Sequence, residues 1–272
     1  MSDSAAIAAA GSVPSGVSST LPRRVAVVSG SSSGIGRATA VRLAALGYNL
    51  VLHGVTEDEQ LGESVRMCRE QGADVAALAG DVRDVAVPRR LVELAANSFG
   101  RLDALVSNAG AGLTKRFIDI TPEDWSSLLR VHLDAATVSC RAAYELLRDS
   151  RGSIVMLSSV AATRALPGRV GYGVAKAAIE GFTRNLACEW APEGIRVNAV
   201  APGTVLTPLV ESNLERGLLD PDGVLERTPM GRFGAPTEIA SVISFLLSVD
   251  ASYVTGQTLY VDGGWSCWGG WS

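Results

Sequence analysis

Histidine, cysteine and long apolar runs are scarce in this sequence. The chain of 272 residues has two histidines and four cysteines, and no two cysteines form a CxxC pair. Neither a disulfide framework nor a metal site is therefore expected, and the thiols are expected to be reduced and mostly buried. No segment has the roughly 18 consecutive apolar residues of a membrane span, so we expect no membrane partner.

Basic clusters and a targeting signal are also missing. Lys and Arg total 24 against 28 Asp and Glu, and no run of basic residues could follow a phosphate backbone, which disfavours nucleic-acid binding. Residues 1–21 are rich in Ala, Ser and Gly and have neither a basic start nor a leucine-type core. They therefore predict a flexible N-terminal tail instead of a signal peptide, with a cytoplasmic location as the corresponding expectation.

The sequence does contain, over residues 22–272, short runs rich in Val, Ile and Leu that alternate with helical segments. This alternation is typical of βαβ units and predicts an α/β fold: one domain with a doubly wound, Rossmann-type parallel sheet and helices on both faces. Ligands of such sheets bind at the carboxyl ends of the strands. Six helical stretches separate seven expected strands, which are Val25–Ser29, Asn49–His53, Asp74–Ala79, Ala104–Ser107, Ser153–Leu157, Arg196–Ala199 and Thr258–Val261.

Two helix boundaries have clear local causes. The first helix opens at Gly34 and is expected to end at Gly47, because glycine readily takes the left-handed conformation that follows a helix. A later helix is expected to begin after Thr121, whose hydroxyl suits the N-cap, with Pro122 in the first turn.

A glycine-rich turn connects the first strand to the first helix. Residues without Cβ permit the backbone torsions of a tight turn and let a pyrophosphate lie against main-chain NH groups at the positive end of a helix. The position between a strand and a helix, near the start of a βαβ array, favours a dinucleotide-binding turn over an ordinary one. The candidate cofactor contacts here are Gly30, Ser32, Ser33, Gly34, Ile35 and Gly36.

Further candidate contacts follow other strands at the same expected edge. Asp81 could accept a hydrogen bond from an adenine amino group, and small residues at Ala109 and Gly110 let the backbone approach a ribose. Each is an ordinary loop residue alone, but together they lie along a line suited to a dinucleotide. The full set at these strand ends is Gly54, Asp81, Val82, Asn108, Ala109 and Gly110.

Tyr172 and Lys176 are four residues apart in a segment with helical character, so their side chains share one face. A lysine ammonium ~4 Å from a phenol contributes about 4 kcal/mol at an effective dielectric near 20, which lowers the phenol pKa by up to ~3 units. We therefore expect Lys176 to bring Tyr172 toward the range where it exchanges protons. Lys176 is also placed to hold ribose hydroxyls, and the hydroxyl of Ser159, just past the fifth strand, can hold a carbonyl or alcohol oxygen.

The sequence resembles the short-chain dehydrogenase/reductase family in its compact form, and the likeness covers nearly everything after residue 22. The resemblance implies that Ser159, Tyr172 and Lys176 are catalytic in hydride transfer between a nicotinamide cofactor and a secondary alcohol or ketone. It also implies a substrate loop at about 204–232 and a homotetramer formed partly by the last strand. Pro202, Gly203, Val205 and Thr207 would face the nicotinamide. The matching motifs are Gly30–Gly36 (GSSSGIG), Asn108-Ala109-Gly110, Ser159, Tyr172-Gly-Val-Ala-Lys176, Asn198, Pro202-Gly203 and Asp262-Gly263-Gly264.

Two positions depart from the family pattern. The family usually has Asn where this chain has His132, and that Asn holds a water for proton relay. His132 is therefore a candidate catalytic residue that binds this water or changes the relay, and a core histidine satisfied by the backbone is the alternative. Ser107 replaces the more usual first Asn of an NNAG sequence and leaves Asn108 in place.

The cofactor is expected to be NAD, with NADP as the alternative. Family members that use NAD usually have an acid after the second strand, and NADP users have basic residues there or before the second glycine of the turn. This chain has Gly54, Val55 and Ser33 at those positions, so neither pattern is present. NAD is favoured because a 2′-phosphate would meet no cation and would face Glu57 and Asp58.

Other features leave the substrate open. Arg164 and Arg169 could favour an anionic substrate, although solvated loop arginines are the more ordinary interpretation. Three aromatic residues after the last strand, Trp265, Trp268 and Trp271, could pack in a subunit interface or line a pocket. Two rival functions remain: a non-catalytic dinucleotide-binding scaffold or sensor, and a sugar epimerase or dehydratase. The epimerases and dehydratases use a GxxGxxG spacing, whereas this turn is GxxxGxG.

Overall fold

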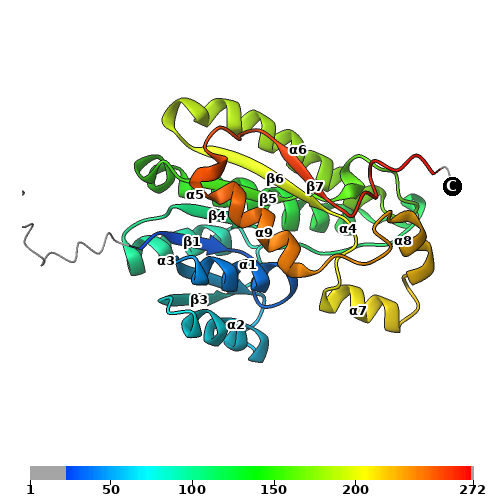
Figure 1. Cartoon of the computed structure of the whole chain (residues 1–272), viewed down its shortest axis with the longest axis horizontal. Helices are drawn as coiled ribbons and strands as arrows, with labels where there is room; N and C mark the ends of the chain where they lie inside the picture. The colour runs from blue at the N-terminus through cyan, green and yellow to red at the C-terminus, as the bar shows by residue number, and fades with distance from the viewer. Residues whose placement is uncertain (1–22, 271–272) are drawn as a thin grey trace, which may run out of the picture.

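The computed structural model describes residues 23–270, and the expected doubly wound parallel sheet is confirmed. All seven strands run parallel in the order β3-β2-β1-β4-β5-β6-β7 (Figure 1). The strands are β1 (Val25–Val28), β2 (Asn49–Gly54), β3 (Val75–Ala79), β4 (Ala104–Ser107), β5 (Ser153–Leu157), β6 (Arg196–Pro202) and β7 (Thr258–Val261).

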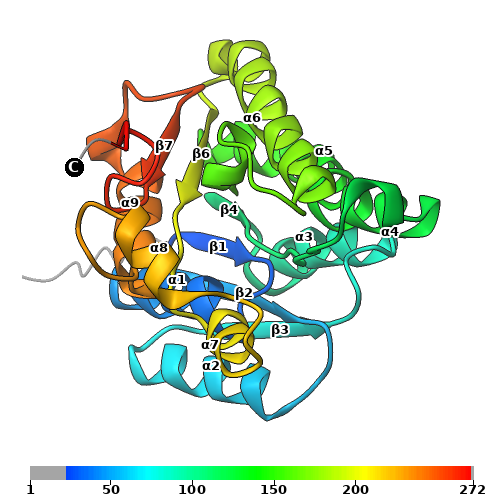
Figure 2. The ribbon, with the colours of Figure 1, turned by 90° about the vertical axis from the view of Figure 1, so that its right-hand side faces the viewer.

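Helices cover both faces of this sheet (Figure 2). They are α1 (Gly34–Ala45), α2 (Glu59–Glu70), α3 (Ala86–Phe99), α4 (Pro122–Leu129), α5 (Ala135–Ser150), α6 (Val170–Trp190), α7 (Pro208–Glu215), α8 (Pro221–Arg227) and α9 (Pro236–Leu247). A π-helical turn at Arg130–Asp134 joins α4 to α5.

In strands β1 to β6, alternate residues face two separate hydrophobic cores, whereas β7 contributes to one of them. In β1, Ala26 and Val28 face the core shared with α1, α2 and α9, whereas Val25 and Val27 face the core shared with α3, α5 and α6. Strands buried on both faces are continuous apolar runs, which is why the sequence pattern predicted them. The two cores fix the sheet between its helical layers, so the loops at the carboxyl ends of the strands start from rigid positions.

The region 204–232 differs from the predicted loop because it contains two helices. Thr207 caps α7 by accepting a hydrogen bond from the Val210 NH, and Asp220 caps α8 in the same way through its carboxylate. Each cap is followed by proline in the first turn, which is the pattern that correctly predicted α4 after Thr121. The count of six helical stretches was therefore too low, because the same chemistry applies within this segment.

Smaller differences concern element ends. β2 extends to Gly54 and β6 extends to Pro202, which pairs with Val261 of β7, while β3 begins at Val75 instead of Asp74. The first helix ends at Ala45, and Gly47 follows with a φ of 84° as expected for the residue after a helix.

From β1 the sheet continues to β2 and β3 on one side, and from β4 it continues to β5, β6 and β7 on the other side. The loops that leave β1 and β4 therefore run in opposite directions. A crevice at this position, at the carboxyl ends of the strands, is where ligands of open α/β sheets bind. In Figure 1, α7 and α8 lie beyond these strand ends.

Candidate active site

The glycine turn after β1 packs closely enough to require its glycines. A Cβ on Gly36 would lie 2.1 Å from the Gly30 carbonyl oxygen and 2.6 Å from the Asn108 side-chain nitrogen. Gly30 and Gly34 have φ angles of 63° and 54°, in the left-handed region that side chains with Cβ rarely adopt. The turn therefore brings its backbone against the first turn of α1, as the sequence predicts for a phosphate-binding segment.

Asn108 ties this turn to the end of β4. Its side-chain nitrogen donates to the carbonyl oxygens of Ser29 and Gly30, each at 2.9 Å. The Ser29 hydroxyl in turn accepts from the backbone NH groups of Asn108 and Ala109, each at 3.0 Å. Because these bonds use the amide of Asn108 within the protein, its direct contribution is to the shape of the turn.

Other predicted cofactor contacts lie around the same edge. A Cβ on Gly54 would be 3.4 Å from the Ser32 Cβ, so the end of β2 lies against the turn. Val82 is buried, and the Asp81 carboxylate pairs with Arg83, whose hydrogen bond lowers the pKa of that carboxyl. This ion pair, which was not predicted, holds Asp81 ionised and leaves it able to accept further hydrogen bonds.

The segment after β6 reaches back to the glycine turn. Gly203 is packed against Asp262 after β7, where an added Cβ would lie 2.9 Å from the Asp262 Cα. Val205 is buried and forms an isolated bridge with Gly234. Thr207 lies next to Gly34, since a Cβ on this glycine would be 3.2 Å from the Thr207 methyl group. Pro202, Gly203, Val205 and Thr207 thus share the edge that holds the glycine turn.

Ser159, Tyr172 and Lys176 come together across β5 and α6, as predicted. Ser159 follows β5 and its hydroxyl accepts from the Ala161 NH at 3.2 Å. Tyr172 lies in the first turn of α6, and the Lys176 ammonium is 5.6 Å from the centre of its ring. The Lys176 Nζ donates to the Leu157 carbonyl oxygen at 2.7 Å, which anchors this side chain to the end of β5.

The electrostatic balance at Tyr172 differs from the prediction. Burial raises the pKa of the Tyr172 hydroxyl, and a hydrogen bond with Ser159 and the positive charge of Arg169 only partly oppose this rise. The expected lowering of this pKa by Lys176 is therefore wrong for the protein alone. Burial also lowers the pKa of Lys176 to about 7, so its ammonium carries only part of its charge at neutral pH.

Arg169 supplies the charge that the sequence analysis assigned to Lys176. Its guanidinium carbon lies 5.9 Å from the centre of the Tyr172 ring, and a Cβ on Gly112 would be 3.5 Å from one of its terminal nitrogens. Within residues 23–270, no carboxylate forms an ion pair with this half-buried side chain. A positive group thus faces the candidate catalytic tyrosine from the start of α6.

His132 has one ring nitrogen satisfied by the backbone, as in a core histidine, and one ring nitrogen that could hold a water. Its Nε2 is 2.9 Å from the Ala111 carbonyl oxygen, a contact that satisfies one nitrogen from the backbone. Its Nδ1 is buried and has no hydrogen-bond partner within the described residues 23–270. Burial first, and then the nearby charge of Lys176, lower the pKa of His132 to about 3, so the imidazole is neutral. Its ring meets the Tyr172 ring edge-on at 5.5 Å between centres.

A buried carboxylate that was not predicted, that of Glu180, lies next to these residues. Glu180 follows Lys176 by one helical turn, and it accepts hydrogen bonds from the Ser158 hydroxyl at 2.9 Å and from the Tyr260 hydroxyl at 3.1 Å. The Tyr260 hydroxyl also lies 3.0 Å from that of Thr163. The network connects β5, α6 and β7 behind Ser159. The spacing of four between Lys176 and Glu180 was the available indication, but nothing in the sequence identified Glu180 as buried.

The C-terminal segment closes one side of this region. The Arg227 guanidinium, at the end of α8, lies 5.0 Å from the Trp265 ring centre and 5.4 Å from that of Trp268. Arg164 donates to the Ser266 carbonyl oxygen at 2.9 and 2.6 Å. Trp265 and Trp268 thus contact a helix of their own chain, whereas the prediction for Trp271 lies outside the described residues.

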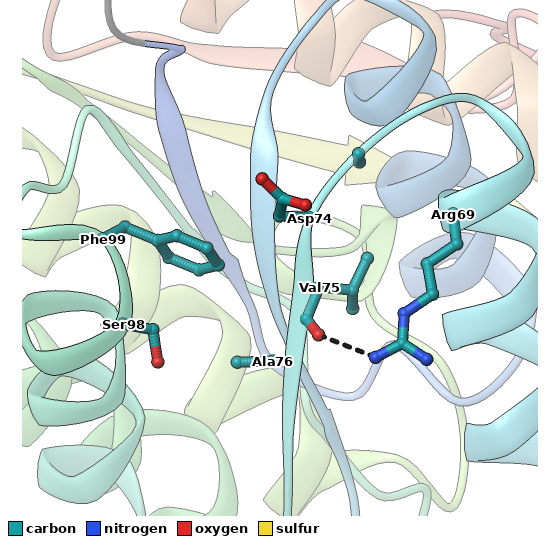
Figure 3. Close-up of a pocket in the computed structure, with 7 residues that line it drawn as sticks. Arg69, Asp74, Val75, Ala76, Ser98 and Phe99 are labelled. Atoms are coloured by element: carbon teal, nitrogen blue, oxygen red, sulfur yellow. Dashed lines mark hydrogen bonds between the residues drawn. The ribbon is translucent and has the colours of Figure 1, made fainter.

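A second cavity lies away from the glycine turn. A pocket of about 320 Å³ lies between the end of α2, the start of β3 and the end of α3, where Arg69 donates to the Val75 carbonyl oxygen (Figure 3). It lies at the amino end of β3, on the opposite edge of the sheet from the glycine turn.

Across residues 23–270, no helix is long and apolar enough to cross a membrane, and no three His, Cys, Asp or Glu side chains gather as metal ligands. All four cysteines are free, but Cys188 and Cys267 are exposed, so the thiols are less buried than predicted.

A parallel sheet with this strand order, a glycine turn before α1 and a Tyr-Lys pair on the helix after β5 define a nicotinamide-dependent Rossmann-type oxidoreductase. Residues 30–266 match the family model described as enoyl-(acyl carrier protein) reductase. The chain is 38% identical over 248 residues to a glucose 1-dehydrogenase of Gluconobacter oxydans, covering 89% of this chain and 92% of that protein. It is 40% identical over 244 residues to a tropinone reductase homolog of Arabidopsis thaliana, covering 89% of each.

Solved structures agree with these relatives. A levodione reductase superposes with a TM-score of 0.84 at 36% identity, covering 90% of this chain and 98% of that chain. A glucose/ribitol dehydrogenase of the short-chain dehydrogenase/reductase type from Brucella melitensis superposes with a TM-score of 0.81 at 37% identity, covering 89% and 96%. This chain belongs to the short-chain dehydrogenase/reductase family and is an oxidoreductase acting on CH-OH groups.

Proposed function

We propose that this protein interconverts a secondary alcohol and a ketone with a nicotinamide cofactor, and that Tyr172 moves the accompanying proton. The supporting observation is that the Tyr172 hydroxyl hydrogen-bonds Ser159 while the Lys176 ammonium lies 5.6 Å from the centre of the Tyr172 ring, near the sheet edge that carries the glycine turn. The glycine turn, whose tight internal packing requires Gly30 and Gly36, leads directly into the N-terminus of α1, and this arrangement fits a pyrophosphate. When bound, the nicotinamide supplies or accepts the hydride.

In the reductive direction, Tyr172 donates its proton to the ketone oxygen as that oxygen gains negative charge. Ser159 donates a hydrogen bond to the same oxygen and holds it toward Tyr172. The Arg169 charge and the hydrogen bond with Ser159 stabilise the phenolate left on Tyr172. Lys176, which is held by the Leu157 carbonyl, would bond the ribose hydroxyls of the cofactor. Because burial raises its pKa, the Tyr172 phenol is protonated before the reaction and can donate that proton to the ketone oxygen.

We also propose a role for His132 in this proton movement. Its neutral imidazole carries its proton on Nε2 toward Ala111, which leaves Nδ1 as a buried acceptor beside Tyr172 and Lys176. A water on Nδ1 would connect this acceptor to the Lys176 ammonium. His132 would then hold a relay water without changing charge itself.

NAD is the proposed cofactor, and catalytic efficiency is expected to be higher with NAD than with NADP. Glu57 and Asp58 are exposed just after β2, where they would repel a 2′-phosphate. The nearest candidate cation on α1, Arg37, donates to the oxygens of Ser32, Gln60 and Ser64 and is occupied by them. Steady-state kinetics with both cofactors measures the ratio, and a higher kcat/KM with NADP would contradict this preference.

The substrate is proposed to be a small alcohol or ketone, and the unpaired charge of Arg169 favours one that carries a carboxylate. Replacing Arg169 with Ala is expected to raise KM for the best hydroxy-acid or keto-acid substrate about tenfold, because a charge-assisted hydrogen bond is lost. The KM for an uncharged alcohol should stay nearly unchanged. Arg164→Ala is the matched control, since this exposed arginine already bonds the Ser266 carbonyl. An unchanged KM for the acid substrate in Arg169→Ala would contradict the proposed contact between Arg169 and a substrate carboxylate.

Two structural roles are proposed on the same basis. α7 and α8 within residues 204–232 would act as the lid over the substrate, since they lie beyond the strand ends that hold the glycine turn. A homotetramer is proposed from the family resemblance of Asp262–Gly264 after β7, and size-exclusion chromatography with light scattering measures it.

The deciding experiment is a cofactor-absorbance assay of the purified protein with NAD or NADP and a panel of secondary alcohols, sugars, hydroxy acids and ketones. Turnover that depends on Tyr172 supports the proposal. Cofactor binding without turnover on any member would favour the scaffold alternative.

A further inference from the structure

His53, at the end of β2, lies directly beneath the glycine turn and joins three segments. Its Nδ1 accepts a hydrogen bond from the Gly30 NH at 3.0 Å. Its Nε2 lies 2.8 Å from the carbonyl oxygen of Gly80, the first residue after β3. The backbone of His53 also bonds Ser31, with the Ser31 NH donating to the His53 oxygen at 2.8 Å and the His53 NH donating to the Ser31 hydroxyl at 2.9 Å.

These contacts determine the protonation state of the ring. Because the Gly30 NH is a donor, Nδ1 must be an acceptor, and Nε2 must carry the proton that it donates to the Gly80 oxygen. The side chain is 1% exposed, so both nitrogens depend on these two partners. A second proton on Nδ1 would place two donors face to face and break the bond to Gly30.

We propose that His53 is a positioning residue for the cofactor: its neutral imidazole holds Gly30 in the conformation that receives the pyrophosphate, and its protonation releases the turn. This inference rests on the proposed dinucleotide site at Gly30–Gly36. Gly30 has a left-handed φ of 63°, so its torsions need support from neighbours, and its NH is held from the side of the sheet. The turn can then present its other NH groups to the ligand.

The charged groups around the ring predict how this contact depends on pH. Burial lowers the pKa of His53 below its usual 6.5, and the nearby Asp81 carboxylate opposes this effect only in part. Asp81, after β3, and Asp58, at the start of α2, have lowered pKa values and stay ionised between pH 5 and 7.5. The hydrogen bond to Asp81 raises the pKa of Arg83, and the Arg37 guanidinium on α1 donates to the Ser32 carbonyl oxygen. His53 is therefore the group of this cluster that gains a proton as the pH falls below 6.5.

Two substitutions separate the contacts of the ring. His53→Gln keeps a donor near the Gly80 oxygen but removes the acceptor for the Gly30 NH. His53→Asn places its amide oxygen near the position of Nδ1 and keeps that acceptor. We expect His53→Gln to raise the Kd for NAD about tenfold at pH 7.5, and His53→Asn to raise it less.

Isothermal titration with NAD at pH 7.5 and pH 5 tests the proposal, with circular dichroism and thermal unfolding to show that each variant is folded. Wild-type Kd is expected to rise at pH 5, and the Kd of His53→Gln is expected to show a smaller pH dependence. Equal Kd values for wild type and His53→Gln, or a wild-type Kd independent of pH, would overturn the role of His53 and would leave the proposed function unaffected. No binding of NAD or NADP by the wild type would overturn the proposed function as well.

Discussion

Replacing Tyr172 with Phe is expected to lower kcat for alcohol oxidation by about 10³-fold while the Kd for the cofactor changes little. General acid–base catalysis by one positioned group contributes about 10²–10⁴-fold, and Phe keeps the ring but not the proton. The ring itself packs against His132 and Lys176, so the variant should fold normally. Absorbance of the reduced nicotinamide measures turnover, and isothermal titration measures cofactor binding.

Tyr253→Phe provides the matched control for this substitution. Tyr253 is fully exposed and lies far along the chain from α6, so removal of its hydroxyl should leave both kcat and Kd unchanged. Retained redox activity in Tyr172→Phe would contradict the proposal that Tyr172 moves the proton. Loss of cofactor binding together with turnover would instead show that the Tyr172 hydroxyl is needed to bind the cofactor, so that the loss of turnover would no longer isolate proton transfer.

Replacing Gly36 with Ala is expected to weaken cofactor binding about 100-fold and to destabilise the fold by about 3 kcal/mol. The added Cβ would lie 2.1 Å from the Gly30 carbonyl oxygen, so the turn or the start of α1 must shift. Overpacking of a close-packed site costs about 1–3 kcal/mol, and the same shift moves the NH groups meant for the pyrophosphate. Titration with NAD and thermal unfolding measure the two effects.

Gly62→Ala makes the same chemical change where space is free. Gly62 is the fourth residue of α2 and is exposed, and an added Cβ meets nothing within 4 Å. Alanine should therefore stabilise the protein by about 0.5–1 kcal/mol through its higher helix propensity, with no effect on cofactor binding. If Gly36→Ala binds NAD as tightly as Gly62→Ala does, the turn is not the pyrophosphate site.

Much of the candidate site was predictable because local sequence and parallel topology both constrain it. The glycine turn follows from its position between a strand and a helix, and a spacing of four places Tyr172 and Lys176 on one face of α6. The Thr-Pro pattern that predicted α4 applied equally to α7, so that helix was available from the sequence and was overlooked.

Charges and buried polar partners were much harder to predict. The pKa of Tyr172 depends on how completely the fold buries it, and the charge that opposes this burial comes from Arg169, three residues earlier in the chain. Neither His53 nor Glu180 belongs to a local motif that indicates that its side chain is buried. Their roles follow from partners at Gly30, Gly80 and Tyr260, which lie far from them along the chain.

By itself, the sequence determined the βαβ order, the glycine turn and the helical spacing of the tyrosine and the lysine, because each of these depends on residues close together in the chain. Only the tertiary structure decided which groups are buried, which charges face Tyr172, and which imidazole supports the turn. Desolvation and long-range hydrogen bonds depend on segments that meet only when the sheet has assembled, and no local pattern encodes them.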